Sequence, residues 1–209
     1  METKKKYIRT LAIIILIALS IEQVSAAGAW KKLNTGDDVS IYERWVEVND
    51  NLTVKQRRVE ITVTSTFSQV LSVLTDPSKT PLWMENVSES YRIKKVTDNQ
   101  WYSYTYFKLP WPLDNRDLVC RSTLRNINEK ESEITMVSTE QYIPQKQDVK
   151  RFINYNAVWH ITDLGKGEIK ISLTVISYTS PEFPRIVQDP IVRNVFRQNM
   201  LRLKIVVMQ

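Results

Sequence analysis

The chain has 209 residues, and its 29 Lys and Arg against 23 Asp and Glu give a formal net charge of +6. This length is enough for one domain with a hydrophobic core, and so mild a basic excess gives no signature of nucleic-acid binding. Cys120 is the single cysteine, which excludes an internal disulfide, and the single histidine, His160, has no partner at metal-ligand spacing, so no metal site is expected.

The N-terminus shows the three zones of a secretory signal peptide. A basic zone from Lys4 to Arg9 precedes the apolar run "TLAIIILIALSI", and "EQVSAAGA" follows with small residues. The apolar run is shorter than the ~20 residues that a membrane span needs. We therefore predict a signal peptide over residues 1–26, cleavage after Ala26 or Ala27, and a periplasmic or secreted protein. An uncleaved N-terminal anchor is the alternative.

The remaining chain, 28–209, is predicted to be one domain that begins with two strands and two helical segments. The alternating runs 38–48 and 52–63 are joined by "NDN", which is typical of a hairpin. In "STFSQVLSVLTDP" the apolar residues recur at helical spacing, with Ser65 or Thr66 as the N-cap and Pro77 as the stop. "SKTPLWMENV" then predicts a second short helix or a turn.

Strand-like runs dominate the second half, with turn residues between most of them. Such close spacing favours an antiparallel meander, because parallel strands need long crossovers. The last segment, 181–208, predicts a long helix in which Pro184 suits the first turn, whereas Pro190 predicts either a kink or the true start. The predicted strands are 88–97, 100–109, 116–127, 132–140, 154–163 and 167–178.

Strand alternation assigns an inward face to four of these runs. Charged residues such as Arg121 and Lys170 prefer solvent, so the opposite faces of their strands point inward. The inward positions are apolar with a few small polar atoms, which fits a bulky hydrophobic ligand; a solid core without a cavity is the alternative. The predicted ligand-binding residues are Leu118, Cys120, Ser122, Met136, Ala157, Trp159, Ile171 and Leu173. For Tyr102, Tyr104 and Tyr106, which share one face, the sequence does not decide the direction.

The order of motifs resembles the StAR-related lipid-transfer (START) domain family of the helix-grip superfamily, which also contains polyketide cyclases and birch-pollen-allergen-like proteins. The resemblance rests on "PLWMENV", on "WYSYTYF" leading into "PWPLDNRDLV", and on "YNAVWHITDLGKGEIKISLTVIS" before the last helix. It implies an α+β helix-grip fold, in which a curved antiparallel β-sheet wraps around a long C-terminal α-helix and encloses an apolar cavity.

The resemblance also implies that the turn 108–115 lies at the mouth of this cavity. Trp111 and Leu113 would then close the entrance or touch lipid, since tryptophan suits a membrane interface. The alternative is that Trp111 packs under the turn as a core anchor. Arg116 and Asp117 are expected to fix the turn through ion pairs or hydrogen bonds.

Two functions from different classes follow. The first is binding and transfer of a lipid or hydrophobic small molecule by a monomer in transient contact with a membrane, without nucleic acid or cofactor. The second is a cyclase-like or hydratase-like enzyme, which needs an inward acid–base pair. Its ionisable candidates are tyrosines, Glu85 and Arg116, so no catalytic residue is assigned. A secreted structural or stress-related protein with an incidental pocket is a third option.

Overall fold

A computed structural model of the protein describes residues 28–33, 38–49 and 51–209. The predicted signal peptide and both predicted cleavage sites lie outside these residues. No helix in the described part of the chain is long and apolar enough to cross a membrane.

One curved sheet carries the fold, in the order β1-β2-β3-β10-β9-β7-β6-β5-β4. Every pair along this path is antiparallel, as the closely spaced strand signals predict. The strands are β1 (Lys31–Leu33), β2 (Ser40–Asn49), β3 (Leu52–Thr64), β4 (Val87–Thr97), β5 (Gln100–Phe107), β6 (Arg116–Asn128), β7 (Glu131–Ser138), β9 (Tyr155–Gly165) and β10 (Glu168–Ser177). β8 (Lys150–Arg151), which was not predicted, pairs in parallel with the start of β6.

The N-terminal hairpin joins the sheet through the last strand. β3 pairs with β10 over eight positions, from Glu168 opposite Thr64 to Val175 opposite Arg57. The turn between β9 and β10 is tight, and Gly165 and Gly167 adopt φ values of +84° and +78° there, which glycine accommodates without strain. The two glycines of "LGKG", residues 164–167, are therefore explained by backbone conformation.

Three short or medium helical segments follow β3. In α2 (Phe67–Leu74) the N-cap is Thr66, whose side chain accepts a hydrogen bond from the backbone N–H of Gln69 at 3.2 Å. Pro77 ends this region as predicted and opens the 3-10 turn η1 (Pro77–Lys79). α3 (Thr80–Trp83) follows at once and carries Trp83 towards the concave side of the sheet.

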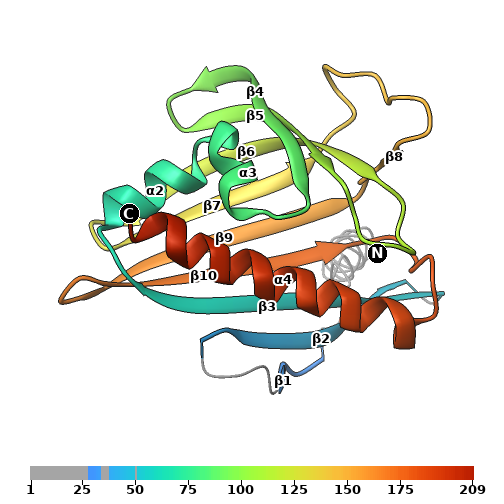
Figure 1. The fold of residues 1–209 in the computed structure, drawn as a ribbon, viewed down its shortest axis with the longest axis horizontal. Helices are drawn as coiled ribbons and strands as arrows, with labels where there is room; N and C mark the ends of the chain where they lie inside the picture. The colour runs from blue at the N-terminus through green and yellow to red at the C-terminus, as the bar shows by residue number, and fades with distance from the viewer. Residues whose placement is uncertain (1–27, 34–37, 50) are drawn as a thin grey trace, which may run out of the picture.

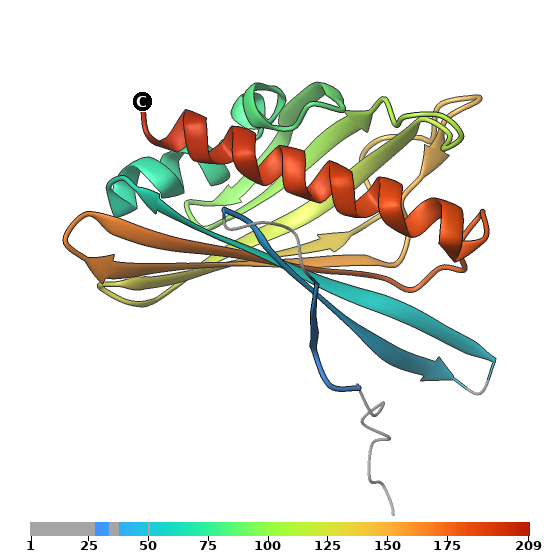
Figure 2. The ribbon, with the colours of Figure 1, turned by 60° about the horizontal axis from the view of Figure 1, so that its bottom comes forward.

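The long helix α4 (Arg185–Val207) lies across the concave face of the sheet (Figures 1 and 2). It begins at Arg185, so Pro190 lies inside it rather than at its start. The two halves of α4 differ: Met200, Leu203 and Val207 are buried in the apolar core, whereas the N-terminal half places Asp189 against charged residues of the sheet. The α+β helix-grip architecture is confirmed.

The main core lies between the sheet, α2 and the C-terminal half of α4. Its buried members come mostly from the concave faces of β3, β9 and β10, where Ile61, Ile171 and Ile161 are cross-strand neighbours. This core fills one end of the space under α4. A cavity remains towards the other end.

Candidate ligand-binding cavity

The concave side of the sheet contains two neighbouring chambers that share four wall residues: Met84, Phe107, Leu118 and Tyr155. The inner chamber has a volume of about 60 Å³ and the outer chamber about 250 Å³. Each is several times larger than the ~10–15 Å³ that a single water molecule needs. The structure therefore contains a cavity, in contrast to the alternative of a solid core.

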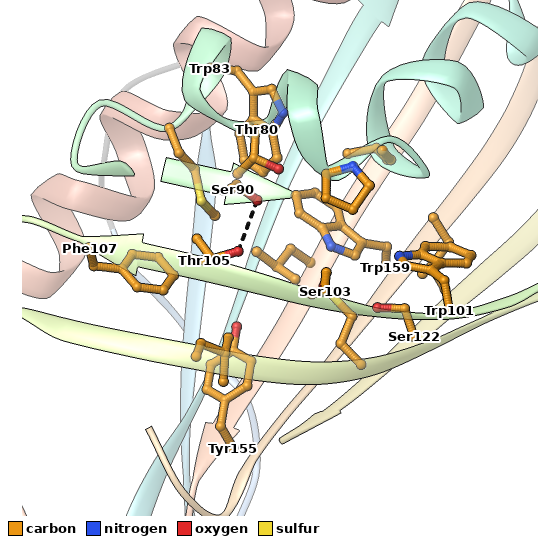
Figure 3. A pocket seen from close by; sticks show the side chains of 17 residues that line it. Thr80, Trp83, Ser90, Trp101, Ser103, Thr105, Phe107, Ser122, Tyr155 and Trp159 are labelled. Atoms are coloured by element: carbon orange, nitrogen blue, oxygen red, sulfur yellow. Dashed lines mark hydrogen bonds between the residues drawn. The ribbon is translucent and has the colours of Figure 1, made fainter. Parts of the chain in front are cut away.

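Five of the eight predicted ligand-binding residues line the inner chamber: Leu118, Ser122, Met136, Trp159 and Leu173. They come from four strands, and their side chains meet because alternation directs them all to the concave face. Figure 3 shows Ser122 and Trp159 directed into the same space as Trp83 of α3.

The other three, Cys120, Ala157 and Ile171, do not line either chamber, although they point inward as predicted. Ala157 and Ile171 are packed into the hydrophobic core, and Cys120 is buried in β6 between Ser103 and Ser138 of its neighbouring strands. Burial raises the pKa of the Cys120 thiol. Alternation indicates which face a residue lies on, but not whether its neighbours cover it.

Sequence reasoning missed the contribution of β5 to the inner chamber. Trp101, Ser103, Thr105 and Phe107 line it, so Tyr102, Tyr104 and Tyr106 belong to the convex face. Tyr104 is nevertheless fully buried, because the segment after β7 covers it and places Lys146 over its ring. With both faces of β5 covered, alternation alone could not orient the strand.

The inner chamber is aromatic with a few neutral polar atoms. The rings of Trp83 and Trp159 meet edge to face at 5.7 Å, and the hydroxyls of Ser90 and Thr105 share a hydrogen bond of 3.0 Å. Trp83 is 4% exposed, and its Nε1 has no hydrogen-bond partner among the described residues. Tyr155 is the one ionisable residue among the described residues of this wall, and burial raises its pKa.

The outer chamber lies under the N-terminal half of α4 and reaches the turn 108–115. Leu109, Leu113 and Arg116 line it. Trp111 does not: its side chain is 90% exposed, which excludes the core-anchor alternative.

Arg116 and Asp117 are fixed by partners in two different segments. Arg116 forms an ion pair of 2.6 Å with Glu182, just before α4. Asp117 is fully buried and binds Arg151 of β8 through two hydrogen bonds of 2.8 and 2.6 Å. Arg151 also donates to the carbonyl of Ile143 at 2.6 Å, so this pair attaches the segment after β7 to the convex face.

A cluster of five charged residues joins α4 to β2 and β3; we call it the Glu43 cluster, and it consists of Glu43, Lys55, Arg57, Asp189 and Arg193. Arg193 donates to Glu43 at 2.9 and 2.7 Å, and Arg57 bridges Glu43 and Asp189 at 2.9 and 2.6 Å. Lys55 also contacts both carboxylates. Burial alone would raise the pKa of Glu43, but hydrogen bonds and charges from Arg193 and Arg57 prevail and lower it to about 2.

Of the enzyme candidates, Arg116 and Tyr155 line the cavity, but Arg116 is engaged by Glu182 at 2.6 Å. Glu85 is paired with Arg202 at 3.2 Å and is not a wall residue of either chamber. His160 is half exposed, 3.6 Å from Glu133 on the convex face. Among the described residues, no group of three or more His, Cys, Asp or Glu side chains is placed to hold a metal ion.

Comparison with protein families decides the relationship: the family model of the START domain matches residues 18–180. The chain belongs to the START domain family. The match begins within the predicted signal peptide and stops before α4. None of the curated proteins compared with the chain matches it.

Many solved structures match this START domain, and three of them illustrate the shared fold. The STAR-related lipid transfer protein of Xanthomonas axonopodis is 20% identical, with a TM-score of 0.75, covering 86% of this chain and 99% of that one. Human StAR-related lipid transfer protein 5 is 17% identical, with a TM-score of 0.76 and coverage of 100% and 99%. Human STARD10 is 18% identical, with a TM-score of 0.71 and coverage of 86% and 73%.

Proposed function

We propose that this START domain binds a lipid, or a similarly bulky hydrophobic molecule, in the two chambers and transfers it between membranes. The observation that carries the proposal is the pair of neighbouring chambers on the concave side of the sheet. Among the described residues, the inner wall holds four aromatic rings besides Tyr155 and no charged side chain. Family membership and the names of the structural relatives support the same role.

The energetics of such a cavity favour transfer over tight retention. A lipid chain gains ~0.8 kcal/mol for each CH₂ removed from water, but the bilayer already provides that gain. The cavity therefore needs only to match the bilayer, and a low barrier to opening sets the rate. Tyr155 fits this role as well, because a buried phenol that stays protonated suits hydrogen bonding to a ligand rather than acid–base catalysis.

Filling the inner chamber tests the proposal. Ser122→Leu should lower lipid uptake from vesicles at least tenfold, because the added side chain occupies a space of about 60 Å³, while any overpacking costs no more than ~1–3 kcal/mol of stability. Lipids that co-purify with the full chain, identified by mass spectrometry, should be lost in parallel. Thr123→Leu, on the opposite face of β6, is the matched control. A folded Ser122→Leu protein with normal uptake would contradict lipid binding in this chamber.

We further propose that the turn 108–115 and the start of α4 touch the membrane during transfer. Trp111 and Ile186 are 90% and 84% exposed. Lys150 joins the two segments, because it pairs with Asp114 of the turn and with Glu182 just before α4. Exposed apolar side chains at a cavity mouth are suited to enter the lipid interface.

Trp111→Ala should therefore slow lipid transfer between vesicles several-fold while changing the free energy of unfolding by less than ~0.5 kcal/mol, as expected for an exposed side chain. Melting and transfer are measured on the same sample. Leu164→Ala, an exposed apolar residue at the β9–β10 end, should affect neither. Normal transfer by Trp111→Ala would exclude a role of this residue at the mouth.

Export is the remaining part of the proposal, and it rests on the basic, apolar and small-residue zones of residues 1–27. In a host that exports the protein, N-terminal sequencing should find a chain that begins near Ala27 or Gly28. Recovery of exported protein that still starts at Met1 would favour the uncleaved anchor instead.

A further inference from the structure

The two chambers differ sharply in charge. None of the described residues that line the inner chamber is charged at neutral pH. The outer chamber, in contrast, is lined by Lys55, Arg57, Arg116 and Arg185, with Glu182 as its acidic wall residue. A ligand that occupies both chambers therefore meets neutral surroundings at one end and cations at the other.

The inner end offers a hydrogen-bond donor that the protein leaves unused. Trp83 Nε1 is buried without a partner among the described residues. Ser103 and Ser122, also buried, lie in the same wall. A buried N–H without an acceptor is unfavourable, so a neutral acceptor on a ligand would be stabilised there. A charged group would lose its hydration without gaining a counter-charge.

The outer end has positive charge left over after the internal ion pairs are counted. Lys55, Arg57, Arg185 and Arg193 are four cations, and Glu43 and Asp189 are two anions, which leaves +2. Arg116 and Lys150 are offset separately by Glu182 and Asp114.

Arg185 is the residue of this group that has no carboxylate partner among the described residues. It donates to the backbone carbonyl of Thr53 at 3.2 Å and lies over the ring of Trp45 at 4.8 Å. These contacts hold its guanidinium at the wall of the outer chamber, where it can bind an anion.

We propose that the ligand is a long-chain amphipath with two different ends: an anionic group, carboxylate or phosphate, held in the outer chamber by Arg185, and an uncharged hydrogen-bond acceptor held in the inner chamber by Trp83 Nε1. The inference rests on the proposed function, since it requires that the chambers hold a hydrophobic chain. It adds the polarity and the orientation of that chain.

Three acids that differ only at the far end test the inner chamber on the full chain: palmitic acid, ω-hydroxypalmitic acid and hexadecanedioic acid, at a pH where all carboxyl groups are ionised. The hydroxy acid should bind about fivefold more tightly than palmitic acid, because its terminal hydroxyl accepts a hydrogen bond from Trp83 Nε1. The dioic acid should bind at least tenfold more weakly than palmitic acid, because one carboxylate would be buried in the inner chamber. Trp83→Phe should abolish the advantage of the hydroxy acid and leave palmitic acid unchanged.

Hexadecanediol, which carries no charge, tests the outer chamber. Arg185→Gln should weaken the binding of palmitic and ω-hydroxypalmitic acid about tenfold and leave the binding of the diol unchanged. Lys204→Gln is the matched control, because Lys204 lies at the far end of α4 and pairs with the exposed Asp38. The Lys204→Gln variant should bind all four probes as tightly as the unmodified protein does.

The possible results distinguish a failure of the two-ended ligand from a failure of lipid binding itself. Equal binding of the dioic and hydroxy acids by the unmodified protein would overturn the neutral inner end, even if Trp83→Phe fails to fold. Equal weakening of acids and diol in Arg185→Gln would overturn the anionic outer end. Failure of all four probes to bind would contradict lipid binding itself, and the inference would fall with it.

Discussion

Replacing Asp117 by alanine should lower the free energy of unfolding by ~3–5 kcal/mol, because it leaves the buried guanidinium of Arg151 without its anion. Two parallel hydrogen bonds link these side chains, and both residues are almost fully buried. The loss should be visible as a lower denaturation midpoint in urea. The segment after β7 should become more accessible to protease, since Arg151 also holds the carbonyls of Ile143 and Pro144.

A more exposed pair between β6 and β7 provides the control. Arg125 and Glu133 lie 3.3 Å apart, and Arg125 is largely exposed, so Arg125→Ala should cost no more than ~1 kcal/mol. Replacing both Asp117 and Arg151 by leucine should restore part of the lost stability, because no unpaired charge then remains. A cost below ~1 kcal/mol for Asp117→Ala would show that water reaches Arg151 in the folded protein.

The second large effect is expected for Glu43. Glu43→Gln should cost ~3–5 kcal/mol at neutral pH, because Lys55, Arg57 and Arg193 are then left with Asp189 alone. Since the Glu43 cluster attaches the N-terminal half of α4 to the sheet, the variant should also open more readily. Lipid transfer should therefore become faster, even though the protein is less stable.

The pH dependence of stability separates Glu43 from the other carboxylates. In the folded protein its pKa is lowered from 4.5 to about 2. The unfolded chain therefore takes up the proton first, so the stabilisation is present above about pH 4.5 and is lost as the pH falls towards about 2. As the pH is lowered through this range, the free energy of unfolding should fall less steeply for Glu43→Gln than for the unmodified protein. Glu47→Gln, exposed on the same strand, should follow the unmodified protein; parallel curves for all three would contradict this assignment.

The antiparallel meander from β4 to β10 could be predicted because its signals are local, whereas the pairing of β3 with β10 was not predicted. Alternation and turn residues define the meander, and Thr66 and Pro77 mark the ends of α2. β8 was missed because a two-residue strand has no period. Its position depends on the distant pair between Arg151 and Asp117, which no local pattern reveals.

The cavity could be predicted only in part, because its walls depend on what covers each strand. Charged residues such as Arg121 indicated which face of each strand points to solvent, as on β6. Five residues of the cavity wall could therefore be predicted. β5 has no such marker, since Trp101 and Tyr104 are buried on opposite faces. The exposure of Trp111 likewise depends on tertiary structure: its sequence context fits a core anchor and a mouth residue equally well.

The pairing of β3 with β10 has a consequence for the synthesis of the protein. β3 ends at Thr64, but its partner begins only at Glu168, so the ribosome must complete residues 65–167 before this edge can be covered. During that interval the strand exposes the side chains of Val59, Ile61 and Val63, together with a row of unpaired backbone groups. The nascent chain therefore has an unpaired strand edge until β10 is synthesised, and the N-terminal hairpin can join the sheet only after that point.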